Sequence, residues 1–158
     1  MAIKKTPADP TNPASEEAAL EDFKEEVGFE IRVTIESVED IVVARQEGRA
    51  LVQSLGFSTT QATLIATAIS ELARNIVLYA ITGEIILSKT VNGHQVGIVI
   101  IAKDHGPGIP DLKHALMSGY TTSGGLGLGL PGVKQIMNSF DIQSEPGKGT
   151  IVTTVMWL

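Results

Sequence analysis

The sequence lacks cysteine, an excess of positive charge and any long apolar run. The absence of cysteine among its 158 residues excludes disulfides, thiol chemistry and metal sites built from thiolates. The net charge of -6 argues against a nucleic-acid partner, because phosphate backbones are bound by basic surfaces. No stretch approaches the roughly 20 apolar residues of a membrane-spanning helix, and no charged-then-apolar signal opens the chain. We therefore expect a cytoplasmic protein that binds neither nucleic acid nor membrane.

The chain divides into a short acidic segment and one domain. Residues 1–28 contain three early prolines, many Asp and Glu residues and one weak helical stripe of apolar residues. Such a composition buries too little apolar surface to fold alone, so we predict a flexible N-terminal tail. Residues 29–158 are long enough to form one globular domain with its own core.

Hydrophobic periodicity predicts strands and helices interspersed along residues 29–158. Alternation at Phe29–Ile35 indicates a half-buried strand, and capping boxes at Ser37 and Ser58 each begin a helix. Further elements are expected as strands at Gly83–Val91, Val96–Ala102, Phe140–Ser144 and Thr150–Trp157, and as helices at Leu112–Met117 and from Pro131. Because no strict βαβ repeat is present, we predict an α/β fold, a two-layer sandwich with a mixed β-sheet covered on one face by helices.

The helix that begins after Ser58 carries two polar residues beside its apolar stripe. The stripe follows the helical period and is expected to face the core; it consists of Ile65, Ile69, Leu72, Ile76 and Tyr79. Glu71 and Asn75 are four residues apart, so they lie one turn from each other at the rim of this stripe. The Asn75 amide oxygen could ligate Mg²⁺, and Glu71 could act as a general base. Considered alone, the pair is better explained as a solvated surface Glu and an ordinary helix Asn.

A second cluster follows the strand at Val96–Ala102, which is apolar on both faces and is expected to be central in the sheet. Asp104 ends this strand and enters a turn with Gly106 and Gly108. Glycine lets the backbone approach a ligand closely, and a carboxylate there could accept a hydrogen bond from an adenine amino group. Alone, this motif is more simply an ordinary Asp-X-Gly turn.

The third cluster, Gly124–Leu130, places four glycines within six residues immediately before a helix. Backbone amides of a glycine-rich loop at a helix N-terminus form an anion site. The loop lacks the Lys-Ser/Thr pair of a Walker motif and the surrounding βαβ unit of a Rossmann fingerprint. We interpret it as a phosphate-binding loop. His94, His105 and His114 show no spacing of zinc ligands, and no role is evident for His105.

Together, these motifs resemble the ATPase superfamily that includes gyrase, Hsp90, histidine kinases and MutL. The matching positions, in chain order, are Glu71 and Asn75; Asp104, Gly106 and Gly108; Gly125, Gly127 and Gly129; and Gly147, Gly149 and Thr150. A narrower resemblance is carried by Ile69–Ile76, Asp104–Pro110 and Thr122–Lys134, with Trp157 near the end. These stretches look like the RsbT-type serine/threonine-protein kinases of bacterial stressosomes. The resemblance covers about residues 29–158 and does not extend to the acidic segment.

The resemblance implies a Bergerat-type ATPase fold that uses ATP and Mg²⁺. It implies that Glu71 is the catalytic base, that Asn75 holds Mg²⁺, and that Asp104, with Thr150, recognises the adenine ring. Residues 112–122 would form a short lid. The nucleotide contacts implied by the motifs are Asn75, Asp104, Gly106, Gly108, Ser123, Gly124, Gly125, Leu126, Gly127, Leu128, Gly129 and Thr150.

The same resemblance implies partner proteins. The substrates would be STAS-domain proteins of the RsbS or RsbR type, and the kinase would then switch to a downstream output protein, typically a PP2C-type phosphatase. A histidine kinase is disfavoured because no histidine precedes His94. Two alternatives stay open: an anti-sigma factor kinase of the same superfamily, and a nucleotide-gated binding module without catalysis. The presence of Glu71 disfavours the second, since binding alone needs no base.

Overall fold

The computed structural model describes residues 29–117 and 128–158. The predicted tail, 1–28, and the glycine-loop positions Ser123–Gly127 lie outside the described residues. In chain order the elements are β1 (Glu30–Ile35), α2 (Val38–Ser54), α3 (Thr59–Asn75), the π-helical turn η1 (Ile76–Ala80), β2 (Gly83–Asn92), β3 (Gln95–Asp104), α4 (Leu112–Ala115), α5 (Gly129–Ile136), β4 (Ser139–Glu145) and β5 (Gly149–Trp157).

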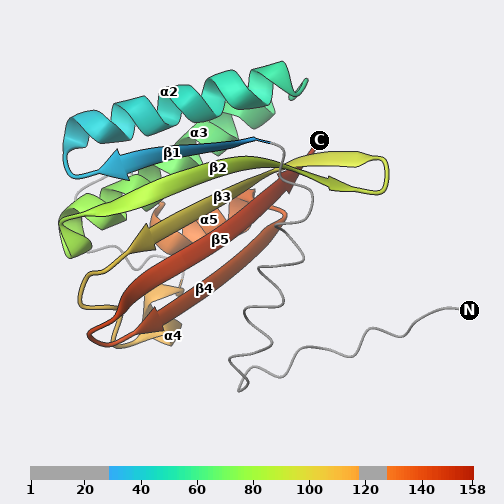
Figure 1. The fold of residues 1–158 in the computed structure, drawn as a ribbon. Helices are drawn as coiled ribbons and strands as arrows, with labels where there is room; N and C mark the ends of the chain where they lie inside the picture. The colour runs from blue at the N-terminus through green and yellow to red at the C-terminus, as the bar shows by residue number, and fades with distance from the viewer. Residues whose placement is uncertain (1–28, 118–127) are drawn as a thin grey trace, which may run out of the picture.

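The elements form two layers, with a five-stranded sheet on one side and helices α2, α3 and α5 packed on one of its faces (Figure 1). This confirms the predicted sandwich. The core between the layers is built from aliphatic side chains at most 2% exposed, among them Ile35, Ile65, Ile69, Leu72, Ile85, Leu87, Ile98 and Ile100. Within the described residues no helix is long and apolar enough to cross a membrane.

The sheet corrects one part of the prediction. A mixed sheet was expected, but the strand order β1-β2-β3-β5-β4 is paired antiparallel at every neighbour. The reason lies in the connections. Strands β2 and β3 form one hairpin, and β4 and β5 form another. After β3 the chain passes through α4 and α5 to β4 at the edge of the sheet, and β5 then pairs between β3 and β4. Strand β3 is central, as its two apolar faces predicted.

Both predicted capping boxes are present. The Ser58 side chain accepts a hydrogen bond from the Gln61 amide while the Gln61 side chain accepts from the Ser58 amide. At the other box the Asp40 carboxylate accepts from the Ser37 amide at 3.0 Å. Helix α5 begins at Gly129, two residues before the predicted start. Pro131 therefore sits in the first turn, where its missing N–H costs no hydrogen bond.

The end of helix α3 differs from the prediction at Tyr79. The apolar stripe was expected to continue inward through this residue, but Tyr79 is 51% exposed. The α-helix gives way after Asn75 to a π-helical turn, whose wider i→i+5 bonding changes the angular position of each later side chain. The turn ends at Ile81, which has φ +72° and ψ -51°; that is a strained conformation for a β-branched residue.

The turn between β4 and β5 offers a paired test of close backbone packing. Gly149 and Gly147 both have positive φ, at +105° and +80°, but a Cβ at Gly149 would overlap the carbonyl oxygen of Asp104, whereas one at Gly147 meets open space. Gly147→Ala should cost about 1–2 kcal/mol from backbone strain alone. Gly149→Ala should cost about 3 kcal/mol, since overpacking adds to the strain.

Equilibrium urea unfolding of both variants measures these costs. Equal losses of stability in the two variants would show that β5 does not need to approach Asp104 as closely as described.

Candidate functional site

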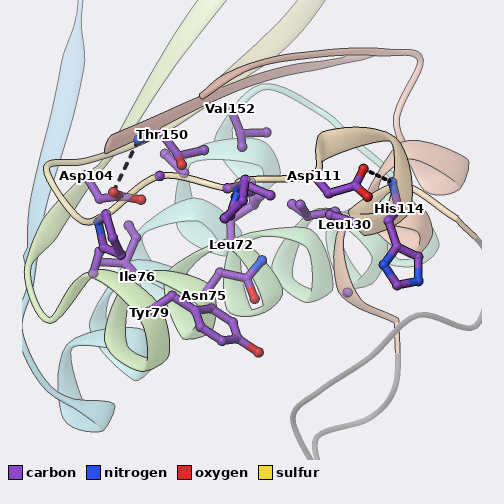
Figure 2. Close-up of a pocket in the computed structure, with 18 residues that line it drawn as sticks. Leu72, Asn75, Ile76, Tyr79, Asp104, Asp111, His114, Leu130, Thr150 and Val152 are labelled. Atoms are coloured by element: carbon purple, nitrogen blue, oxygen red, sulfur yellow. Dashed lines mark hydrogen bonds between the residues drawn. The ribbon is translucent and has the colours of Figure 1, made fainter. Parts of the chain in front are cut away.

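One cavity lies where helix α3, its π-helical turn, the β3–α4 connection and the start of α5 meet the sheet (Figure 2). Its volume is about 570 Å³. The side chains and backbone around it are largely apolar, with a few polar groups; they belong to Leu72, Asn75, Ile76, Tyr79, Ala80, Ala102, Asp104, Pro107, Gly108, Ile109, Pro110, Asp111, His114, Ala115, Gly129, Leu130, Thr150 and Val152. An apolar cleft with few polar groups is the usual form of a small-molecule site.

Asp104 is held at one end of this cavity by backbone amides. Its Oδ1 accepts hydrogen bonds from the Gly106 amide at 2.9 Å and from the Thr150 amide at 3.3 Å. Both bonds use the same oxygen, so Oδ2 is the atom left to meet a ligand. Asp104 also pairs with Thr150 across β3 and β5, and the carboxylate is therefore fixed to the sheet.

The turn after Asp104 is fastened to the β4–β5 turn. The Gly147 amide donates to the Pro107 carbonyl at 2.9 Å, and the Ile109 amide donates to the Ser144 hydroxyl at 2.7 Å. That hydroxyl is 2.8 Å from the Thr150 hydroxyl. Gly108 has φ +77° and lies against the Glu145 carbonyl, where a Cβ would overlap. These bonds make one wall of the cavity rigid.

Helix α3 contributes Asn75 to the cavity and Glu71 behind it. Asn75 is half-buried and its amide group lies at the middle of the cavity (Figure 2). Glu71 is only 5% exposed and is not among the residues that surround the cavity. Its Oε1 accepts from Arg74 Nη1 at 2.8 Å, and its Oε2 accepts from the Gly129 amide at 3.3 Å. The carboxylate thus links α3 to the first residue of α5, which does line the cavity.

The structure brings most of the described motif residues together. Asn75, Asp104, Gly108, Gly129 and Thr150 surround one cavity, although they come from four separate parts of the chain. Gly106 supports Asp104 through its amide, as described above. Leu128 is the residue just before α5 and is 37% exposed.

Sequence reasoning missed several residues of the cavity. Tyr79 was assigned to the core, Asp111 was not assigned to the site, and His114 was included only as part of the proposed lid, residues 112–122. The signal for the last two was present, because Asp111 is the N-cap of the short helix α4 and accepts from the His114 amide at 3.0 Å. An Asp immediately before the predicted helix at Leu112 is a typical N-cap and could have indicated that this turn is ordered.

Comparisons with known proteins agree with this geometry. Residues 60–158 match the family model for the histidine kinase-, DNA gyrase B-, and HSP90-like ATPase. The chain is 50% identical over 119 residues to the serine/threonine-protein kinase RsbT of Bacillus subtilis (strain 168), spanning 75% of this chain and 90% of RsbT. It is 29% identical over 100 residues to an anti-sigma F factor of Thermoanaerobacter sp. (strain X514), spanning 60% of this chain and 68% of that protein.

Among solved structures, a mycobacterial sensor histidine kinase, MprB, aligns over 82% of this chain and 97% of its own, with 15% identity and a TM-score of 0.47. The family match covers β2 to β5 and every described motif of the site. The chain belongs to the histidine kinase-, DNA gyrase B- and HSP90-like ATPase family and, within it, to the relatives of the serine/threonine-protein kinase RsbT.

Proposed function

We propose that this chain is a cytoplasmic serine/threonine-protein kinase that phosphorylates STAS-domain partners of the RsbS or RsbR type with ATP. The observation that carries the proposal is the placement of Asn75, Asp104 and Thr150 around one cavity, with Glu71 directly behind its wall. The 50% identity to RsbT supports the same activity. After phosphorylation the kinase would release the partner and bind a downstream output protein such as a PP2C-type phosphatase.

The residues around the cavity fit an adenine nucleotide. A volume of about 570 Å³ lies within the usual range of small-ligand sites. Asp104 Oδ2 is free to accept from the adenine amino group, because the two backbone amides both bond to Oδ1. Ile76, Ala102 and Val152 offer apolar surface to the adenine ring. At the other end, the first turn of α5 favours negative charge.

Asn75 is the residue that would hold Mg²⁺. Mg²⁺ keeps most of its waters and takes few protein oxygens, so one amide oxygen on the cavity wall suits it. When bound, the ion would neutralise charge on the phosphates of the nucleotide. Asn75 supplies its oxygen without adding a negative charge of its own.

Glu71 would take the proton of the partner's hydroxyl. As that proton leaves, the hydroxyl oxygen bonds to the γ-phosphorus and the bond to the ADP oxygen breaks, which leaves a phosphorylated partner and ADP. Arg74 and the Gly129 amide hold one oxygen each of the Glu71 carboxylate. Arg74 thus fixes the orientation of the base, and a small movement at the start of α5 would expose Oε2.

An anti-sigma factor kinase is the second candidate, because anti-sigma F factors are also similar to this chain. Such a protein would bind a sigma factor as well as a STAS-domain antagonist. Binding of a sigma factor separates the two candidates, and it is included in the partner experiment below.

The base assignment predicts that Glu71→Gln keeps nucleotide binding and lowers phosphoryl transfer by about 10² or more. Glutamine keeps the shape of the side chain and still accepts from the Gly129 amide, but it is too weak a base to take the proton. Transfer from radiolabelled ATP to a STAS-domain protein measures the effect, with a fluorescent nucleotide to measure binding. Glu47→Gln is the matched control, since it makes the same change at an exposed position of α2. Full transfer by Glu71→Gln would remove Glu71 as the base.

The metal assignment predicts that Asn75→Ala weakens ATP binding about tenfold in the presence of Mg²⁺, through the loss of one ligand to a charged complex. In EDTA the variant and the wild type should bind alike. Asn92→Ala, at an exposed position in the β2–β3 hairpin, is the control. Wild-type affinity of Asn75→Ala in Mg²⁺ would exclude Asn75 from the metal site.

The partner assignment predicts phosphoserine or phosphothreonine on a co-expressed STAS-domain protein, detected by mass spectrometry. The phosphate should be absent when Glu71→Gln replaces the wild-type kinase. A sigma factor should not co-purify with the chain; its stable capture would favour the anti-sigma alternative.

A further inference from the structure

The sheet carries an apolar surface on the side that none of the described helices covers, which we call the open face. Helices α2, α3 and α5 pack on the other side (Figure 1), and alternate side chains of a strand point to opposite faces. An antiparallel sheet with one face in water usually places polar residues there. The three inner strands instead place six large apolar residues on the open face, which are Ile86, Val99, Ile101, Ile151, Val155 and Trp157.

The centre of the open face is buried. Ile86 is 7% exposed, and Val99 and Val155, which pair across β3 and β5, are each 3% exposed. At Gly97 a Cβ would overlap the ring of Trp157, so the indole lies over β3 and extends the apolar surface. Side chains on a solvated sheet face keep contact with water, and these small exposed fractions therefore indicate that the face is covered.

The described part of the chain begins at the edge of the open face. Glu30, the first residue of β1, pairs with Ser88 on β2. Ser88 in turn pairs with Val99, and Val99 with Val155. The chain therefore enters β1 level with the buried centre of the open face. Residues 1–28 are covalently tethered at this point, which gives them a high effective concentration at the face.

The sequence of this segment contains the pattern of an amphipathic helix. Ser15 is a typical N-cap residue, and Glu16 and Glu17 follow it in the first turn, where negative charge is favourable. From there to position 27 the largest apolar side chains share one helical face; the residues of this stripe are Ala19, Leu20, Phe23 and Val27. Alone the stripe buries too little apolar surface to fold, but an apolar sheet face would supply the missing partner.

The segment also has the length to cross the open face. A helix over residues 16–27 would be about 18 Å long, at 1.5 Å per residue. The path from β1 over β2 and β3 to β5 is three strand spacings, about 14 Å. Gly28 lies between this stretch and β1, and glycine permits the sharp reversal that would turn the helix back over the sheet.

We propose that residues 16–27 form an amphipathic helix that docks on the open face, with its apolar stripe against Val99, Val155 and Trp157. The acidic side of the helix then faces solvent. A tethered segment is favoured over a second copy of the chain, because association of two chains costs translational and rotational freedom. The inference goes beyond the proposed function and does not depend on it, since the candidate site lies on the side of α3 and α5.

Trp157 is the one tryptophan of the sequence, so its fluorescence reports on the open face. The experiment measures the emission wavelength and acrylamide quenching of Trp157 in the full chain. The wild type is compared with Phe23→Asp and with the double variant Leu20→Asp/Phe23→Asp, which place charge on the stripe. Ala18→Asp is the matched control, because it adds one charge about 140° around the helix from Phe23.

Both stripe variants should shift the Trp157 emission to longer wavelength and lose its protection from acrylamide, with the larger loss in the double variant. Ala18→Asp should behave as the wild type. Sedimentation over a range of protein concentrations identifies the occupant of the face. The wild type should keep its Trp157 protection on dilution, whereas self-association confined to the stripe variants would support the proposal, because an uncovered apolar face promotes association.

Equal quenching of the wild type and the double variant at low protein concentration would overturn the docked helix. Trp157 protection that rises with concentration in the wild type and the double variant alike would assign the open face to a second copy of the chain, and would overturn the proposal as well.

Discussion

The site depends on how closely three segments of backbone approach Asp104. The Gly149 Cα lies so near the Asp104 carbonyl that no side chain fits there, and a Cβ at Gly106 would be 2.7 Å from the backbone of Ala80. This packing brings the Thr150 amide to the carboxylate and the end of helix α3 to the turn. Because Asp104 also ends a paired strand, the rest of the cavity is built around a carboxylate that is anchored to the sheet.

Glu71 is the second anchor of the site, and it connects helices α3 and α5 instead of strands of the sheet. Its two oxygens join Arg74 of α3 to the first amide of α5, so one buried carboxylate sets where α5 begins. The proposed base is therefore held in one orientation, and both of its oxygens already have partners. The contact with the Gly129 amide both positions and restrains Glu71, so access to this proposed base depends on the start of α5.

Much of this arrangement could be predicted from the sequence, and the reasons are local. The capping boxes at Ser37 and Ser58 and the alternation in β1 are encoded by neighbouring residues, and they were predicted correctly. The pairing of strands is not local, so the fully antiparallel sheet was missed. Tyr79 was misassigned because periodicity presumes 3.6 residues per turn, and a π-helical turn does not keep that period. Asp111 was missed because its place depends on where the turn after Asp104 folds back.

The π-helical turn at Ile76–Ala80 also bears on how this site could change over evolutionary time. Because i→i+5 bonding holds an extra residue in the turn, the loss of one residue there would let α3 finish as an ordinary helix. It would also relieve the strained backbone of Ile81, which has a positive φ. The Ile81 side chain is exposed, so no burial of apolar surface offsets that strain. The same loss would rotate Tyr79 by about 100° away from the cavity. The π-helical turn therefore couples the backbone strain at Ile81 to the position of Tyr79 at the cavity.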